Sequence, residues 1–396
     1  MAGGFNHGGD IRRAAKAFGL DSGEILDFSA NINPLGPPAG AIRAVLDNVP
    51  SVVHYPDPEC YELKQALAAY YGVSPRMIMV GNGAAELIFL LGTLARGKKA
   101  LIPAPTFSEY EAAVLAGGGT VEILPLDPAQ GFELRADQVL RFIRPTRAYQ
   151  GIKMVFLATP NNPTGGLIPK ETLMKIAAVA RGRGVTVVVD EAFLDFLPER
   201  AASSMMAHIA DYPNLLVVTS LTKLFAVPGL RIGALVGPPE VLEGLEGARP
   251  PWTVNSLAQA AGCAAVADGE YLKASWRLIQ EEKEWLHQAL GEIEGLHAFP
   301  PAANFILVDI SGSGFNSTQL WREMARQSVL VRDCASFRGL GRDYIRVAVR
   351  SRRENEVLVR TLRQTVEDNF PQAAGPGFLR RRGGLPDAVQ KGGSRP

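Results

Sequence analysis

Residues 215–233 read LLVVTSLTKLFAVPGLRIG. The apolar, β-branched beginning predicts a buried strand, which ends in a polar turn that carries Ser220, Thr222 and Lys223. A segment of small residues then leads to Arg231. The lysine amine can form a Schiff base, while the two hydroxyls and the guanidinium can bind a phosphate beside it. The segment therefore suits a phosphorylated aldehyde, although taken alone it also fits a solvated surface lysine.

Two other predicted strands end in polar residues. Residues 154–158, MVFLA, form an apolar run that stops at the turn cluster TPNNPTG over residues 159–165. Residues 185–189, VTVVV, form another such run, and Asp190 follows it directly. Open parallel sheets bind ligands at the carboxyl ends of their strands. We therefore expect Asn162, Asp190 and the lysine of the first segment to lie at one edge of a sheet.

In this order and spacing the three segments resemble the pyridoxal-phosphate enzymes of the aspartate aminotransferase fold, which is fold type I. The resemblance implies that Lys223 is the Schiff-base lysine, that Asp190 pairs with the pyridine nitrogen, and that Asn162 hydrogen-bonds the ring hydroxyl. A buried carboxylate keeps the pyridine protonated, and the protonated ring accepts the electrons of a carbanion at Cα. The cofactor that the resemblance implies is pyridoxal 5′-phosphate.

The resemblance extends to the rest of the cofactor site. Residues 81–86, GNGAAE, open an apolar helix, and a glycine turn at a helix N-terminus presents backbone N–H groups to a phosphate. In the family, Phe107 stacks on the pyridine face and Tyr55 reaches the cofactor phosphate of the other subunit. The alternative interpretations are a core residue for Phe107 and an ordinary half-buried tyrosine for Tyr55. The implied cofactor-binding residues are Tyr55, Gly83, Ala84, Ala85, Phe107, Asn162, Asp190, Ser220, Thr222, Lys223 and Arg231.

Composition sets limits on the class of protein. The 396 residues predict two or three domains. With 41 basic and 40 acidic residues the formal net charge is +1, which gives no general attraction to nucleic acid or membrane. Cys60, Cys263 and Cys334 match no metal or disulfide spacing. No apolar run approaches the roughly 18 residues of a membrane span, and the N-terminus lacks the regions of a signal peptide, so we expect a cytoplasmic protein.

We predict four parts of the chain. Residues 1–45 form an N-terminal arm that packs with the small domain. Residues 46–245 form a large cofactor-binding domain and residues 246–370 a smaller α+β domain. Residues 371–396, rich in Gly, Pro and Arg, form a disordered tail.

The large domain is predicted to be α/β, because its strand candidates alternate with helical segments. We expect a seven-stranded, mainly parallel sheet. Its strands begin at Met77, Ala100, Thr120, Met154, Val185, Leu215 and Arg231. In the small domain we expect strands at residues 305–308, 329–332 and 344–349, and in the arm a helix over residues 11–18 followed by an irregular segment over residues 26–37.

The cofactor does not name the reaction, because the Cα bond that stands perpendicular to the pyridine plane is the one that breaks. Within the fold, the chain resembles the threonine-phosphate decarboxylases of cobalamin biosynthesis and the histidinol-phosphate aminotransferases. The resemblance to the decarboxylases is the closer one and covers about residues 5–368. Aminotransferases of this fold hold the α-carboxylate near the ring plane with an arginine of the second lobe. A decarboxylase must bind another group with that arginine.

Three features favour the decarboxylases. The segments HGG at residues 7–9 and FSANINPLG at residues 28–36 look like their N-terminal arm. Phe193 stands where the aminotransferases usually have a tyrosine, although drift at a packing position would also explain it. Arg350 stands where the aminotransferase pattern tends to have a glycine. Strand alternation puts Arg346 and Arg350 on one face, where they can form a phosphate clamp; a surface ion pair is the other interpretation of Arg350.

By resemblance, the expected reaction is decarboxylation of O-phospho-L-threonine to (R)-1-amino-2-propanol O-2-phosphate by a homodimer. The substrate-binding residues implied are His7, Gly8, Asn31, Asn162, Arg332 and Arg346. His7 can instead be a terminal residue without a fixed structure. Histidinol-phosphate amino transfer is the alternative reaction. A pyridoxal-phosphate-binding transcription regulator would need a basic DNA-binding module, for which the arm leaves little room. The choice between phosphothreonine and phosphoserine stays open, since one methyl group contributes only about 1–3 kcal/mol.

Overall fold

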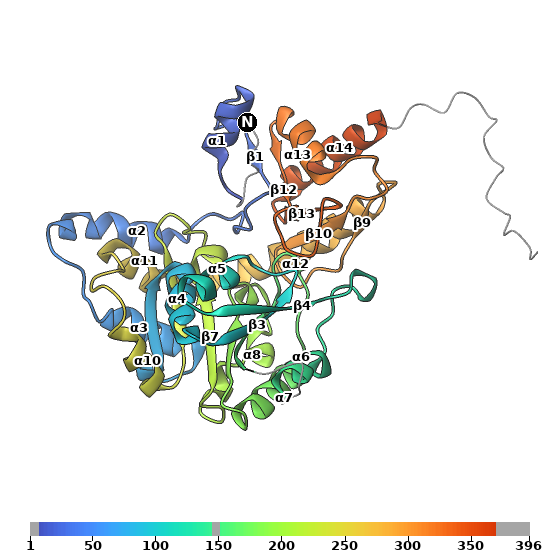
Figure 1. Ribbon diagram of the computed structural model, residues 1–396. Helices are drawn as coiled ribbons and strands as arrows, with labels where there is room; N and C mark the ends of the chain where they lie inside the picture. The colour runs from blue at the N-terminus through green and yellow to red at the C-terminus, as the bar shows by residue number, and fades with distance from the viewer. Residues whose placement is uncertain (1–7, 145–150, 370–396) are drawn as a thin grey trace, which may run out of the picture.

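The computed structural model describes residues 8–144 and 151–369. Its largest element is a seven-stranded sheet with the order β2-β8-β7-β6-β5-β3-β4 (Figure 1). The strands are β2 (Ile78–Asn82), β3 (Lys99–Ala104), β4 (Thr120–Pro125), β5 (Ile152–Ala158), β6 (Thr186–Asp190), β7 (Leu215–Ser220) and β8 (Ile232–Val236). β8 runs antiparallel to both β2 and β7, and the other neighbours are parallel. The predicted seven-stranded, mainly parallel sheet of an α/β protein is confirmed.

Helices cover both faces of this sheet, which explains why its central strands are apolar throughout. Val187 and Val189 of β6 belong to a core that includes residues of α6 and α7, whereas Val188 belongs to the opposite core with α4, α5 and α10. This division follows from the alternation of side chains along a strand. The helices on the large sheet are α3 (Tyr61–Tyr71), α4 (Gly83–Gly92), α5 (Glu109–Ala116), α6 (Ala136–Ile143), α7 (Lys170–Arg181), α8 (Arg200–Ser203), α9 (Leu221–Leu224) and α10 (Pro239–Glu246).

A second, antiparallel sheet of four strands forms a small lobe, in the order β12-β13-β10-β9. Its strands are β9 (His297–Ala298), β10 (Phe305–Asp309), β12 (Arg332–Asp333) and β13 (Tyr344–Ala348), and its helices are α12 (Gly269–Gly291), α13 (Ser317–Arg326) and α14 (Arg352–Asn369). The prediction of a single strand over residues 329–332 was wrong, because two short strands occupy this segment. β12 belongs to the four-stranded sheet, whereas β11 (Val329–Leu330) pairs with the arm. β9 was not predicted either, because strands of two residues carry no periodic signal.

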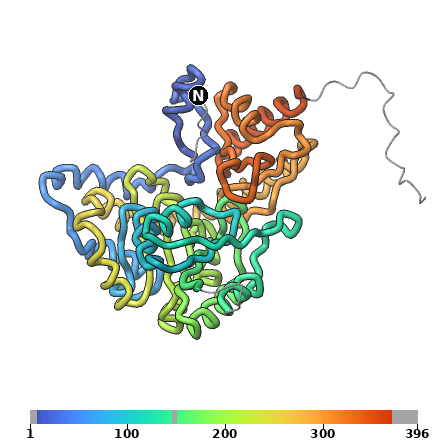
Figure 2. Tube along the Cα trace, viewed as in Figure 1, coloured from blue at the N-terminus to red at the C-terminus, as the bar shows by residue number. Residues whose placement is uncertain are grey.

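The N-terminal arm lies beside the small lobe, and Figure 2 follows the chain from there to the edge of the large sheet. Its helix α1 (Ile11–Phe18) was predicted, and it shares a small core with α13. The segment predicted to be irregular begins instead with a strand, β1 (Leu26–Asp27), which pairs in parallel with β11. Local turn propensity cannot predict this strand, because its partner β11 lies about 300 residues further along the chain.

Two helix contacts cross the limits of the predicted four parts of the chain. The arm limit at residue 45 falls inside α2 (Ala39–Asn48), and α2 packs on α11 (Ser256–Val266). α11 follows the limit at residue 245 but also packs on α3. The division stays a prediction, and its tail lies outside the described residues. Within the described ranges, no helix combines the length and the apolar character needed to cross a membrane.

Candidate active site

A cavity with a volume of about 440 Å³ opens at the carboxyl ends of β5, β6 and β7. The arm, the large sheet and the small lobe all contribute to its wall. It brings together most of the residues predicted from sequence. Those that line it are Gly8, Asn31, Ala84, Ala85, Phe107, Asn162, Asp190, Ser220, Thr222, Lys223, Arg231, Arg332 and Arg346. Their individual roles remain predictions.

Lys223 lies at the junction of β7 and the one-turn helix α9. Burial lowers the pKa of its amine to about 8, and the nearby charges of Arg346 and Arg231 act in the same direction. The carboxylate of Asp190 opposes them. A larger fraction of the amine is therefore neutral near pH 8 than for an ordinary lysine, and the neutral amine is the nucleophile.

Asp190 ends β6, and its carboxylate is buried. One oxygen accepts a hydrogen bond from the hydroxyl of Tyr110 at 2.7 Å and the other from the backbone N–H of Ala192 at 2.9 Å. Burial raises the pKa of this carboxyl, while the two donors and the charge of Lys223 counteract the rise. The site thus holds a carboxylate in place for a cationic ring nitrogen, which would supply the missing opposite charge.

Tyr110 is a site residue that the sequence reasoning missed. Its ring stacks on Phe156 at 5.2 Å and meets Phe107 edge to face at 5.7 Å. Tyr110 therefore connects these two aromatic rings to Asp190. The available signal was its spacing of three residues from Phe107 at a helix start. Other lining residues that were not predicted include Ser29, Ala30, Ile88, Ser108, Ser336 and Phe337.

The N-terminus of α4 contributes Ala84 and Ala85 to the cavity wall. Gly83 has a φ of +77°, and a Cβ at this position would lie 2.6 Å from Nη2 of Arg231. The positive φ favours glycine here, and a side chain would also have to displace the guanidinium. Gly83 itself does not line the cavity, but Ala84 and Ala85 do. The hydroxyls of Ser220 and Thr222 are 2.8 Å apart on the same cavity wall. Hydroxyls, a guanidinium and the first N–H groups of a helix form a donor set that fits a phosphate.

Two buried arginines face the cavity from the small lobe. Arg332 and Arg346 are paired neighbours on β12 and β13, and their side chains are only 4% and 5% exposed. Nη2 of Arg332 donates to Oγ of Ser336 at 2.7 Å. Burial lowers the pKa of Arg346 to about 10, and the charge of Arg332 adds to that effect. Two adjacent buried cations favour an anionic ligand, because a charge removed from water needs an opposite charge.

Arg346 also orients Asn162 and the arm. Its Nη1 donates to Oδ1 of Asn162, and its Nη2 donates to the carbonyl of Ser29 at 2.7 Å. Because the amide oxygen of Asn162 is occupied, its Nδ2 is the group left to donate to a ligand. Among the described residues, Oδ1 of Asn31 and Nε of Arg346 are buried without a hydrogen-bond partner. Such atoms are costly unless a ligand pairs with them.

Besides Gly83, two of the predicted residues that the structure describes lie outside the cavity wall. Tyr55 is 79% exposed and stacks on Trp252 at 4.7 Å, away from the cavity of its own chain. His7 lies outside the described residues. Arg350 does not line the cavity and forms an ion pair with Glu354 at 2.6 Å, so the phosphate clamp with Arg346 was wrong. The predicted ion pair is confirmed, but it is half-buried and not on the surface. The alternation assumed for the clamp stops where β13 ends at Ala348.

Comparisons with known proteins agree with this geometry. A family model described as aminotransferase class I and II matches residues 23–362. The chain is 37% identical to threonine-phosphate decarboxylase of Salmonella typhimurium over 366 residues, which is 92% of this chain and 98% of that protein. It is 33% identical to histidinol-phosphate aminotransferase of Methanothermobacter thermautotrophicus over 91% of this chain and 94% of that protein.

A solved structure of histidinol-phosphate aminotransferase from Sinorhizobium meliloti, in complex with pyridoxal-5′-phosphate, has the same fold. It matches with a TM-score of 0.80 and 23% identity over 93% of this chain and 96% of that one. The predicted fold type I is thus confirmed. The sequence relatives include both a decarboxylase and an aminotransferase, so the reaction must be argued from the site.

Proposed function

The chain belongs to the family of class I and II aminotransferases, and from this premise we propose that it decarboxylates O-phospho-L-threonine to (R)-1-amino-2-propanol O-2-phosphate. It is an enzyme, and its cofactor is pyridoxal 5′-phosphate. The product is a precursor of the cobalamin nucleotide loop. We further propose that the protein acts in the cytoplasm.

The cavity has a suitable group for each part of the cofactor. Ser220, Thr222 and Arg231, together with the first N–H groups of α4, would hold its phosphate. Asp190 would hold its ring nitrogen, and Nδ2 of Asn162 its ring hydroxyl. The complete set that we propose is Gly83, Ala84, Ala85, Phe107, Asn162, Asp190, Ser220, Thr222, Lys223 and Arg231, with Tyr55 from a second subunit. When bound, the cofactor supplies an electron sink for the pair released at Cα.

The observation that carries the decarboxylase proposal is the pair of buried arginines on β12 and β13. A phosphate monoester carries a charge of roughly −1.5 to −2 near pH 7, which matches two guanidiniums better than a single carboxylate does. Arg332 and Arg346 would bind the substrate phosphate, together with Asn31, Gly8 and His7. The α-carboxylate would then be free of an arginine and able to stand perpendicular to the ring.

In the proposed reaction the bond between Cα and the carboxyl carbon breaks. Carbon dioxide leaves, and the electron pair stays on the Cα side. The ammonium of Lys223 then delivers a proton to Cα, which balances the charge and completes the amine product. The low pKa of Lys223, about 8, lets this side chain both accept and release a proton near neutral pH.

Amino transfer from histidinol phosphate is the second candidate. It is favoured by the similarity to histidinol-phosphate aminotransferases, which is nearly as extensive as that to the decarboxylase. In that reaction Cα would lose its hydrogen, and a keto acid would be required to complete the cycle. Dependence on a keto acid therefore separates the two candidates.

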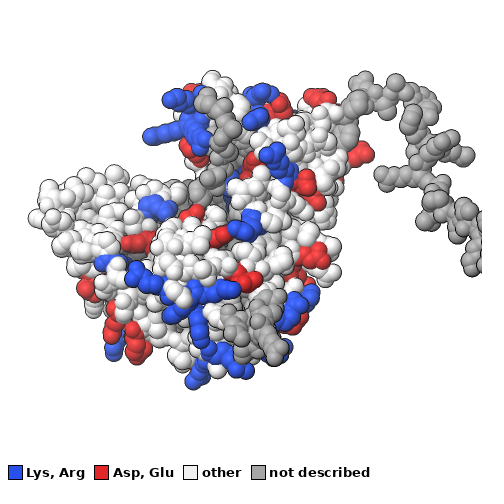
Figure 3. Space-filling model, viewed as in Figure 1, with Lys and Arg blue, Asp and Glu red and all other residues white. Residues whose placement is uncertain are grey.

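We also propose that the enzyme is a homodimer with shared active sites. A surface near α2 and α3 exposes many large apolar side chains, and Figure 3 shows the end of the molecule around α2 with few charged residues. These side chains are Leu35, Ile42, Leu46, Val49, Val52, Val53, Tyr55, Tyr61 and Trp252. An apolar surface of this extent favours a protein contact. Tyr55, which is remote from its own cavity, would be carried by that contact to the cavity of the second subunit.

The test of the proposed reaction uses the cofactor-loaded enzyme and O-phospho-L-threonine labelled at the carboxyl carbon. Released carbon dioxide is counted with and without 2-oxoglutarate. We expect many turnovers in both reactions. Release that needs 2-oxoglutarate, or no release at all, would contradict the proposal. The Lys223→Ala variant is the control for carbon dioxide released by the free cofactor.

A further inference from the structure

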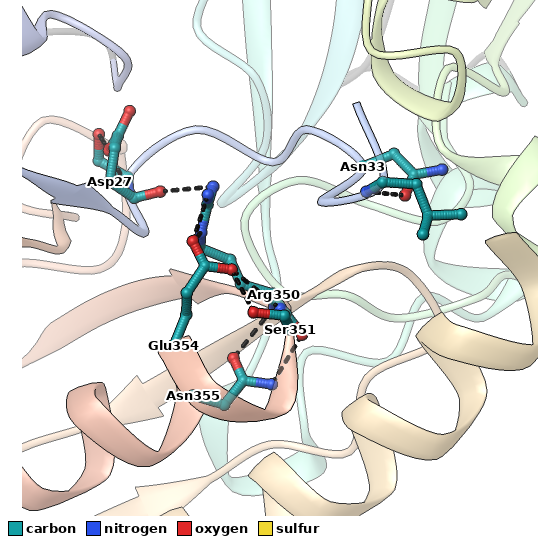
Figure 4. Close-up of polar contacts among 8 residues, drawn as sticks. Asp27, Asn33, Arg350, Ser351, Glu354 and Asn355 are labelled. Atoms are coloured by element: carbon teal, nitrogen blue, oxygen red, sulfur yellow. Dashed lines mark hydrogen bonds and ion pairs between the residues drawn. The ribbon is translucent and has the colours of Figure 1, made fainter. Parts of the chain in front are cut away.

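Arg350 precedes α14 and does not line the cavity; its side chain contacts the first turn of that helix (Figure 4). Its Nε and Nη2 donate to Oε1 of Glu354 at 2.9 and 2.6 Å. The second oxygen of Glu354 accepts from the hydroxyl of Ser351 at 2.6 Å and from its backbone N–H at 3.2 Å. Asn355 accepts from the backbone N–H of Arg350 at 3.0 Å and donates to the buried Glu282. The guanidinium is thus held in one orientation.

The remaining nitrogen of this guanidinium, Nη1, contacts the N-terminal arm. Nη1 of Arg350 donates to the carbonyl of Asp27 at 3.3 Å. Two residues further along, the carbonyl of Ser29 accepts from Arg346, which lines the cavity. Between them, the backbone N–H of Ala348 donates to the carbonyl of Phe28 at 2.8 Å. Two arginines of one chain segment therefore hold alternate carbonyls of the arm.

Within the arm, a chain of hydrogen bonds connects Asp27 to residues at the cavity wall. The carboxylate of Asp27 accepts from the backbone N–H of Ser29 at 2.8 Å and from its hydroxyl at 2.5 Å. The hydroxyl oxygen of Ser29 in turn accepts from the N–H of Gly9 at 2.9 Å. Gly8 packs so closely here that a Cβ would lie 2.0 Å from the carbonyl oxygen of Ser29. Displacing Asp27 would therefore move Ser29 and the glycines that lie against it.

The opposite end of the same arm segment is fixed to the lysine turn. The backbone N–H of Asn33 donates to the carbonyl of Lys223 at 3.1 Å, and its Nδ2 donates to the carbonyl of Leu224 at 2.9 Å (Figure 4). Asn31 lies between the two anchored ends, lines the cavity and has an unpaired Oδ1 within the described structure. Its position depends on both anchors.

We infer that Arg350 is a positioning residue for the substrate pocket. With Glu354 as its support, it fixes the small-lobe end of residues 27–33 and so places Asn31 and Gly8 against the substrate phosphate. The inference rests on the proposed function for its substrate, a phosphorylated amine. It predicts an effect on substrate binding and none on cofactor binding, because the Asn33 anchor and the lysine turn are untouched.

The experiment compares Arg350→Gln with Arg353→Gln. Arg353 is three residues away, exposed, and serves as the matched control. In Arg350→Gln we expect the KM for O-phospho-L-threonine to rise about tenfold with kcat changed less than about twofold, since the binding geometry is loosened while the reacting groups remain. The visible spectrum of the bound cofactor should not change. Hydrogen exchange of the amides in residues 27–31 should be faster than in the wild type and in Arg353→Gln.

A purely structural role gives a different result. In that case Arg350→Gln would lower the melting temperature, with KM the same as in Arg353→Gln, and the inference would be overturned. If Arg350→Gln does not fold, Arg350→Lys keeps the charge beside Glu354 but cannot donate to both partners in the same planar geometry. It should raise KM in the same direction, and an unchanged KM overturns the inference.

Failure of the proposed function gives a separate signal. If the wild type releases no carbon dioxide but transfers the amino group of histidinol phosphate, the decarboxylase proposal fails. The KM comparison is then made with histidinol phosphate, whose phosphate would meet the same pocket wall. A rise in Arg350→Gln alone supports the inference, and equal values in both variants overturn it.

Discussion

The hydroxyl of Tyr110 donates to the carboxylate of Asp190 across 2.7 Å, at the buried end of β6. This contact lies behind the surface that would meet the ring nitrogen of the cofactor. It stabilises the ionised form of a carboxyl whose pKa burial raises. In the proposed function, Tyr110 would thus support the charge of the carboxylate that pairs with the cofactor ring, and sequence motifs did not identify it.

Removing that hydroxyl should weaken the site. In Tyr110→Phe the carboxylate loses one donor, and a hydrogen bond to a charged group is worth roughly 1.5–3 kcal/mol. We expect weaker cofactor binding and a kcat lowered by about tenfold or more. Cofactor titration followed by fluorescence, with steady-state kinetics, measures both. Binding and kcat equal to those of the wild type would show that the contact is incidental.

Cofactor capture by the apo-enzyme should depend on pH through Lys223. Its pKa is about 8 instead of 10.5, so below pH 8 the amine is mostly protonated and cannot attack an aldehyde. The capture rate should therefore rise with pH, with a midpoint near 8, and level off above it. Stopped-flow absorbance at a series of pH values measures the midpoint. A midpoint near 10.5 would contradict the lowered pKa.

The same pH titration, carried out on two arginine variants, tests whether the charge of Arg346 lowers the pKa of Lys223. The charge of Arg346 contributes to the low pKa of Lys223, so Arg346→Gln should move the midpoint to higher pH. Arg353→Gln, at an exposed position, should not move it. A midpoint that is equal in all three proteins would show that Arg346 does not contribute and would leave burial and Arg231 as the causes of the lowered pKa.

Arg346 should also determine affinity for phosphorylated substrates. The Arg346→Ala change removes a buried guanidinium that holds Asn162 and the arm and that we propose binds phosphate. KM should rise by roughly 10- to 100-fold, the equivalent of a charged hydrogen bond of about 1.5–3 kcal/mol. The Arg353→Ala variant should retain the wild-type KM. Wild-type kinetics in Arg346→Ala would remove the support for a phosphate site in the small lobe.

The proposed dimer can be tested through one exposed side chain. Val53 is 78% exposed and lies two residues before Tyr55. A charge in a buried apolar contact is strongly unfavourable, so Val53→Asp should produce monomers that bind the cofactor weakly. Sedimentation velocity measures whether the variant is a monomer or a dimer. The control is Leu115→Asp, a change at an exposed apolar residue of α5. A dimeric Val53→Asp protein would place the subunit contact elsewhere.

Much of the site followed from the sequence because its residues lie at the ends of long apolar runs. The runs before Asp190, Asn162 and Lys223 form β6, β5 and β7, and parallel pairing brings their ends to one edge. A residue's position after such a run therefore predicts its location without any knowledge of side-chain contacts.

What the sequence could not show depends on partners distant in the chain. Tyr110 faces Asp190 across 80 positions, and Asp27 meets Arg350 across 323. The two-residue strands β1 and β11 form because of such a contact and carry no period of their own. The direction of Arg350 was mispredicted for a different, local reason: β13 ends before it, and Glu354 of the following helix then orients its guanidinium.

One competition assay tests the central claim most directly. The loaded enzyme is incubated with equal amounts of O-phospho-L-threonine and histidinol phosphate in the presence of 2-oxoglutarate, and all products are identified by mass spectrometry. The account predicts that 1-amino-2-propanol phosphate accumulates while histidinol phosphate persists and no glutamate forms. Accumulation of glutamate, with O-phospho-L-threonine unconsumed, would contradict it and identify the enzyme as an aminotransferase.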